Sequence, residues 1–187
     1  MQSEANIPAK NHKQVEEIFK QFDLADYKWI DPKRIIVSQW VRMKCMYGCG
    51  EYGNNACCPP NIPAVSECER FFQEYSSAVV FHFTTKVDKP EERHEWSKAI
   101  NLNLSKLERA VFVSGYERAF MLFMDSCSIC NECAENKEDC KNPRIARPSP
   151  EAMAVDVYST VRQFGFPIHV LAEYSQAMNR FAFLLIQ

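Results

Sequence analysis

The spacing of hydrophobic and polar positions predicts four helices. In residues 11–25, apolar side chains recur at intervals of three and four, and the opposite face carries lysine and glutamate. Prolines near the starts of the later segments, and a serine that can cap the last one, are typical of helix N-termini. The predicted helices span residues 11–25, 64–75, 91–113 and 150–164.

Short runs rich in β-branched and aromatic residues predict β-strands between these helices. The runs at 77–83 and 118–124 are almost wholly apolar, which is typical of central strands buried on both faces. Two further runs near the end of the chain, joined by a polar turn, are expected to pair or to close an edge. The predicted strands span residues 34–40, 77–83, 118–124, 168–172 and 180–186.

These elements predict an α/β or α+β fold, in which a mixed sheet of about four or five strands is flanked by helices. The length of 187 residues suits a single domain over residues 1–187. The strand at 118–124 leads directly into a cysteine-rich loop. We therefore expect the cysteine-rich loops at 45–60 and 127–148 to gather at one end of the sheet.

Composition narrows the classes of partner. The net charge is −2, from 22 basic and 24 acidic residues, so no basic excess predicts binding to nucleic acid or to an anionic membrane. The first residues do not resemble a signal peptide, and no apolar stretch approaches the ~18–20 residues needed to cross a bilayer. Nine cysteines in such a chain indicate a reducing cytoplasm and thiols available for metal, rather than disulfides.

The most informative stretch holds Cys127, Cys130, Cys133 and Cys140, followed by Pro143. Three cysteines, each separated by two residues, put three thiolates on one turn, where each can bind a different iron of one 4Fe–4S cluster. The run resembles that of bacterial ferredoxins, although six residues rather than three precede the fourth cysteine. Zinc sites usually take two pairs of ligands from two turns, so zinc is the less favoured alternative. A redox or purely structural thiol cluster is a third interpretation.

A second set of candidate ligands is Cys45, Cys49 and Cys58, with Cys57 and Cys68 as weaker candidates. Glycines and asparagines between them allow a loop to wrap a cofactor, and two prolines stiffen the chain after Cys58. Neighbouring side chains diverge, so Cys57 is ranked below Cys58. Cys68 falls in an apolar helical stripe, which favours the core. Replacement of Cys58 is expected to remove a metal, and replacement of Cys57 or Cys68 to spare it.

Two ligand schemes stay open. In one, each cysteine group holds its own cluster, and the fourth ligand of the first group is Cys57, Cys68 or a non-protein ligand. In the other, the groups exchange a ligand, as in two-cluster ferredoxins. Basic side chains flank the second group, either as a solvated loop or to balance cluster charge and bind an anionic partner. These are Lys137, Lys141, Arg144 and Arg147.

Taken together, these motifs resemble a family of predicted metal-binding proteins from anaerobic bacteria and archaea, known as domain of unknown function 2284. The departures are small: Gly50 replaces a commoner proline, and Pro150 a commoner methionine. The resemblance implies metal binding but no known reaction. It rests on Cys45, Cys49, Tyr52-Gly53 and Cys58-Pro59-Pro60, and on Cys127, Cys130, Cys133, Cys140, Pro143 and Arg147-Pro148-Ser149.

No phosphate-binding glycine loop in a standard spacing appears, so nucleotide binding has no motif behind it. The first hypothesis for function is therefore an electron-transfer or redox accessory protein that passes single electrons to a redox partner protein. The second is an enzyme in which a three-cysteine site leaves one iron open to a small substrate. The third is a structural or sensing module, with zinc or another metal that holds the loops.

Overall fold

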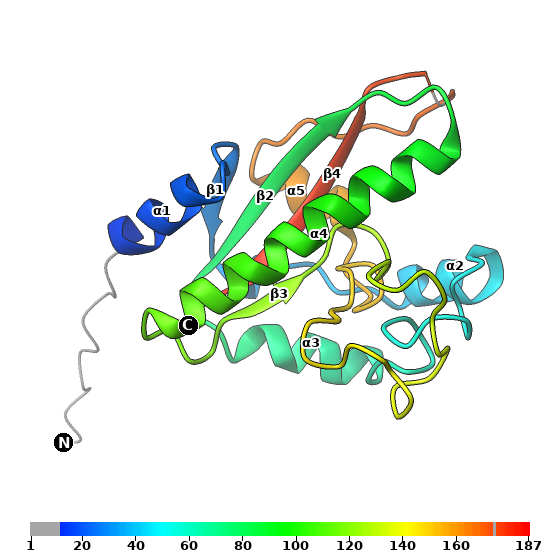
Figure 1. The fold of residues 1–187 in the computed structure, drawn as a ribbon, viewed down its shortest axis with the longest axis horizontal. Helices are drawn as coiled ribbons and strands as arrows, with labels where there is room; N and C mark the ends of the chain where they lie inside the picture. Colours follow the sequence, from blue (N-terminus) through cyan, green and yellow to red (C-terminus); the bar gives the residue numbers. More distant parts are fainter. Residues whose placement is uncertain (1–11, 174) are drawn as a thin grey trace.

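A four-stranded antiparallel sheet forms the centre of the molecule (Figure 1). The computed structural model describes residues 12–173 and 175–187. Neighbouring strands lie in the order β1-β2-β4-β3, and all three pairings are antiparallel rather than mixed. The predicted class, helices flanking a sheet of four or five strands, is confirmed in its α+β form. The strands are β1 (Tyr27–Ile30), β2 (Ala78–Thr85), β3 (Phe120–Leu122) and β4 (Met178–Leu185).

Helices cover both faces of this sheet (Figure 1). On one face lie α1 (His12–Gln21) and α4 (Pro90–Val113), and on the other lie α3 (Val65–Gln73) and α5 (Val157–Gln163). A 3₁₀ turn, η1 (Pro32–Arg34), and α2 (Gln39–Gly48) connect β1 to the cysteine loops. The predicted helices at 64–75 and 91–113 are confirmed as α3 and α4, and the helix predicted from residue 11 is described from His12 to Gln21.

Successive residues of β2 enter different layers of the core. Val79 and Phe81 pack in the layer of α1 and α4, whereas Val80 packs in the layer of α3 and α5. All three are fully buried. Because successive strand residues point to opposite faces, a strand covered on both faces loses the alternation of polar and apolar residues. This explains the continuous apolar run of β2 and confirms its central position.

The strand predicted at 34–40 is not formed. Asp31 caps η1 by accepting the Lys33 N–H at 3.0 Å, Val37 makes only an isolated bridge to Val155, and α2 begins at Gln39. The preceding segment supplies β1 instead and occupies the free edge of β2. The β-branched residues at 35–37 therefore have no strand left to pair with, although Ile35 is buried in the core.

The end of the chain also differs from the prediction. Residues 168–172 form no strand, and β4 lies between β2 and β3 instead of at an edge. The run at 118–124 supplies only the short edge strand β3, and its burial comes from the surrounding loops and helices. The helix predicted at 150–164 begins later, as α5, with Asp156 as its cap at 2.9 Å from the Ser159 N–H.

Candidate metal centre

Helix α4 fixes the start of the second cysteine loop. The buried Asn101 side chain donates to the Met124 carbonyl at 2.7 Å and accepts the Met124 N–H at 3.1 Å. The next residue, Asp125, has a positive φ of 60° and is held by Ser97 at 2.7 Å and by Arg93 at 3.2 Å. These contacts set the direction in which the chain leaves the sheet, two residues before the first cysteine of the loop.

Five thiols line one small cavity in this loop. Four belong to the predicted group, Cys127, Cys130, Cys133 and Cys140, and the fifth is Cys57 from the other loop. All nine cysteines of the chain are free. No carboxylate or imidazole lines the cavity, so its donor set is made of sulfur. Such a set fits an iron–sulfur cluster or a thiolate zinc site and does not suit a hard cation.

N–H groups point at several of these sulfurs. The Ala56 N–H donates to the Cys133 sulfur at 3.3 Å, and the Asn142 side chain donates to the Cys130 sulfur at 3.0 Å. Hydrogen bonds to thiolate sulfur stabilise the charged form of the ligand and tune the metal that it binds. None of these donors is visible as a motif in the sequence.

Cys57 and Cys127 form a hydrogen-bonded pair. The hydrogen bond from the Cys57 thiol lowers the pKa of Cys127, and backbone hydrogen bonds at Ile129 and Arg147 act in the same direction. The same hydrogen bond, together with burial, raises the pKa of Cys57. Within this pair, deprotonation is therefore favoured at Cys127 over Cys57.

The thiols of the first cysteine group influence one another. Cys45 and Cys49 are hydrogen-bonded neighbours, and burial raises the pKa of Cys58, as do Glu51, Cys45 and Cys49 in smaller measure. Burial, followed by the charge of Cys49, raises the pKa of Cys45 to about 11. The sequence places Cys45 in a loop, whereas it lies in the last turn of α2. Cys49 caps the end of this helix in an extended conformation, with its N–H donating to the Cys45 carbonyl at 3.1 Å.

The adjacent cysteines Cys57 and Cys58 lie next to different sets of thiols. Cys57 lines the cavity of the second group, whereas the cysteines that influence Cys58 most are Cys45 and Cys49. The predicted divergence of the two side chains is therefore present, but it directs Cys57 toward another set of thiols rather than away from any site. The two candidate centres are neighbours, joined through the peptide bond between Cys57 and Cys58.

Asn55 joins the two loops. Its buried side chain donates to the Cys127 carbonyl and to Glu51, both at 2.9 Å, and accepts the Cys57 N–H at 3.0 Å. Asn61 adds a hydrogen bond to the Glu135 carbonyl at 2.7 Å. The loops at 45–60 and 127–148 consequently lie side by side beyond β3 (Figure 1), as the sequence predicts.

Cys68 lies outside both groups. It is fully buried in the hydrophobic layer of α3, with its sulfur 3.9 Å from the Met153 sulfur and 3.5 Å from the Pro63 carbonyl. These contacts are those of a small apolar side chain in the core, the role that the helical stripe favours.

No single-ion site is preformed among the described residues, where no three His, Cys, Asp or Glu side chains converge as ligands of one metal ion. The five thiols line one small cavity, and no three of them meet at a single point. A polynuclear cluster distributes its thiolates over several irons, so its ligands stand around a volume.

Only part of the predicted basic set faces the thiols. The charge of Lys137 favours the thiolate forms of both Cys57 and Cys127, and Lys141 lines the same cavity. Arg147 instead forms an ion pair with Glu108 of α4 at 2.9 Å. The lysines are therefore placed to balance the charge of the second group, whereas Arg147 attaches the loop to the helix.

Comparison with known proteins agrees with this arrangement of thiols. Among the helices of residues 12–173 and 175–187, none is both long and apolar enough to span a bilayer. No curated protein and no solved structure matches the chain. One family model, described as "Predicted metal-binding protein (DUF2284)", matches residues 28–186, a range that holds all nine cysteines and the whole of strands β2, β3 and β4. The chain therefore belongs to the DUF2284 family of predicted metal-binding proteins.

Proposed function

We propose that the second cysteine group binds a 4Fe–4S cluster and that the protein transfers single electrons between this cluster and a partner protein. The observation that carries the proposal is the all-thiol cavity lined by Cys57, Cys127, Cys130, Cys133 and Cys140. Its donors are all sulfur, and N–H donors and a lysine beside them can support a negatively charged cluster.

Anaerobic purification followed by iron, sulfide and zinc analysis tests this cofactor. We expect acid-labile sulfide in proportion to iron, and a visible absorption band that bleaches reversibly on one-electron reduction. Stoichiometric zinc without sulfide would contradict the proposal and favour the structural or sensing module. In that case removal of the metal should unfold the loops, because metal binding would then supply folding free energy.

A second function is favoured by the first cysteine group. Cys45, Cys49 and Cys58 lie together, but Cys57 faces the other cavity and Cys68 lies in the core. A cluster on these three thiols would keep one iron without a cysteine ligand and open to a small substrate as a Lewis acid. A spectroscopic signal of the first group that shifts on adding a small ligand, with the signal of the second group unchanged, would support this enzymatic role.

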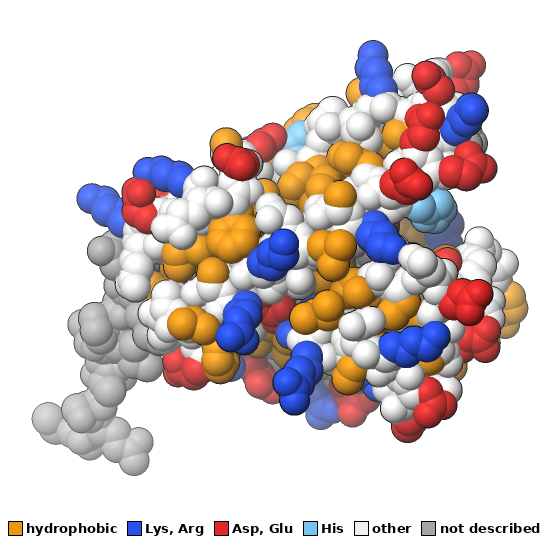
Figure 2. All heavy atoms as spheres, in the orientation of Figure 1, with side chains coloured by type: hydrophobic (Ala, Val, Ile, Leu, Met, Phe, Trp, Pro, Cys, Tyr) orange, Lys and Arg blue, Asp and Glu red, His pale blue; other side chains and the backbone are white. Residues whose placement is uncertain are grey.

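A surface beside the second cysteine loop suits an acidic redox partner. A hollow of about 470 Å³ is lined by Lys106, Arg109, Arg144 and Arg147 against two glutamates, with the partly exposed side chains of Phe112 and Ile145 among them. Figure 2 shows such mixing of basic and hydrophobic side chains on the face that α4 covers. Apolar contact surrounded by unlike charge is suited to weak, fast association.

Reversing charge in this hollow is expected to slow electron exchange. Arg109→Glu with Arg144→Glu should lower the second-order rate of reduction by a reduced acidic ferredoxin about tenfold at low salt, because steering by unlike charge is lost. Stopped-flow bleaching of the cluster measures this rate. The difference should disappear at about 1 M salt, where the Debye length is about 3 Å. Lys86→Glu, on the distant β2–α4 connection, is the control, and an equal loss in that variant would contradict this docking surface.

A further inference from the structure

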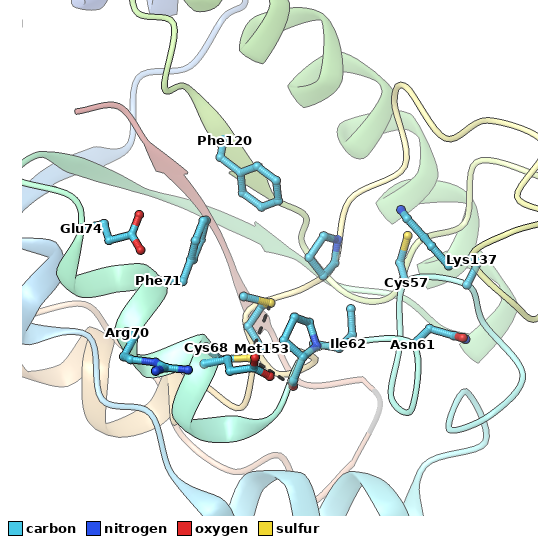
Figure 3. A pocket seen from close by; sticks show the side chains of 14 residues that line it. Cys57, Asn61, Ile62, Cys68, Arg70, Phe71, Glu74, Phe120, Lys137 and Met153 are labelled. Atoms are coloured by element: carbon cyan, nitrogen blue, oxygen red, sulfur yellow. Dashed lines mark hydrogen bonds between the residues drawn. The ribbon is translucent and has the colours of Figure 1, made fainter.

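A second cavity, of about 620 Å³, lies beside the thiols of the second group (Figure 3). Its walls come from α3, from the segment that follows the first cysteine loop, and from β3. Cys57 lines this cavity as well as the small cavity of the second cysteine group. A volume of this size is typical of sites for small molecules. The cavity therefore gives a small molecule access to the wall of the metal centre.

The inner surface of the cavity is apolar. Phe71 and Phe120 face each other edge to face with ring centroids 5.3 Å apart, and Ile62 and Met153 line the same space. Figure 3 shows the two rings on one side of the cavity, with Cys57 across from them. Aromatic and aliphatic side chains arranged in this way bind the body of an apolar ligand by shape and by release of water.

The carboxylates at the cavity are already engaged. The Glu67 carboxylate accepts the Ala64 N–H at 2.9 Å at the start of α3. The Glu74 carboxylate lies 4.0 Å from the Arg118 guanidinium. Both carboxylates therefore already have a partner within the protein.

The two cations of the cavity differ in their surroundings. The Lys137 amine lies at the same end as the Cys57 thiol, so the thiolates of the metal centre can balance its charge (Figure 3). Arg70 lies at the opposite end, on α3 (Figure 3), and forms no ion pair with any residue that the structure describes. A guanidinium matches carboxylate and sulfonate oxygens with paired N–H donors.

We propose that this cavity binds a small organic anion with an aromatic or branched apolar body, which is a function beyond electron transfer. The anionic group contacts the Arg70 guanidinium. The body lies along Phe71 and Phe120, and its far end reaches Cys57 at the edge of the metal centre. Arg70 thus selects the charge of the ligand, and the apolar walls select its shape.

Equilibrium dialysis of the full-length, metal-loaded protein tests the proposal with two dyes of the same ring system. The anionic probe is 1-anilinonaphthalene-8-sulfonate, and the neutral probe is N-phenyl-1-naphthylamine. We expect one molecule of the anionic dye per chain, bound more tightly than the neutral one. Arg70→Gln should weaken binding of the anionic dye about fivefold or more and leave the neutral dye unchanged. Circular dichroism verifies that the variant is folded.

Arg109→Gln is the matched control, because Arg109 lines the other basic hollow of the molecule. This variant should keep the affinity of the wild-type protein for both dyes. Equal affinity of the wild-type protein for the two dyes would overturn the proposal. A loss in Arg109→Gln with none in Arg70→Gln would overturn it too. Dialysis measures binding whichever metal the chain carries, so this result is independent of the iron and sulfide analysis.

Discussion

Replacement of Cys57 by serine is expected to remove the metal of the second cysteine group, and replacement of Cys58 by serine to remove that of the first. A 4Fe–4S cluster takes four of the five thiols at the cavity of the second group, and we assign Cys57 as one of these four because it is hydrogen-bonded to Cys127. Cys58 lies with Cys45 and Cys49. If both groups hold 4Fe–4S clusters, each change should lower the iron content by about four atoms per chain. Metal analysis, with sulfide analysis and electron paramagnetic resonance, shows which centre is lost.

Cys68→Ser is the matched control for both changes. It introduces the same hydroxyl into the core, where Cys68 contacts Met153 and the Pro63 carbonyl. It should keep both centres and lower the free energy of unfolding by about 1 kcal/mol. Loss of metal from Cys68→Ser, or an unchanged metal content in Cys57→Ser, would contradict the division of the adjacent cysteines between two groups.

The division of Cys57 and Cys58 between two groups is the feature of the site that the sequence alone does not predict. Spacing alone groups Cys127, Cys130 and Cys133, because ligands two residues apart share a turn. The position of Cys57 is different, since it depends on Asn55 drawing the first loop against the Cys127 carbonyl. Contacts between segments about 70 residues apart have no periodic signature in the sequence. The ranking of Cys58 above Cys57 as a ligand stays a prediction until the variants are measured.

The fold likewise has elements that the sequence predicts and elements that depend on contacts between distant segments. Helices α3 and α4 were predictable because apolar residues recur at the helical period along them. Strand β2 was predictable because it is covered on both faces and is therefore apolar over most of its length. The strand predicted at 34–40 has suitable residues but loses its pairing edge to β1, which is a competition between segments. The central place of β4 likewise follows from its pairing on both sides and not from its composition.

The Cys57 and Cys58 variants test the metal content of the loops. A change in α4 tests the ion pair that attaches the second cysteine loop to this helix. Glu108 is buried, and its carboxylate accepts hydrogen bonds from the Arg147 guanidinium at 2.9 Å and from the Met121 N–H at 3.2 Å. Burial raises the pKa of Glu108, and the charge of Arg147 opposes the shift. Arg147 directly precedes the end of the second cysteine loop, so this ion pair joins the loop, β3 and α4.

Glu108→Ala is expected to lower the free energy of unfolding by about 3 kcal/mol, because it leaves the largely buried Arg147 charge without a carboxylate and the Met121 N–H without its acceptor. Chemical denaturation followed by circular dichroism measures this loss. The control is Arg109→Ala, at the next and exposed position of α4, which should change the free energy of unfolding by less than about 0.5 kcal/mol. Removing Arg147 as well should restore part of the loss, because the unpaired charge is then gone. Equal stabilities of Glu108→Ala and Arg109→Ala would show that the ion pair does not anchor the loop.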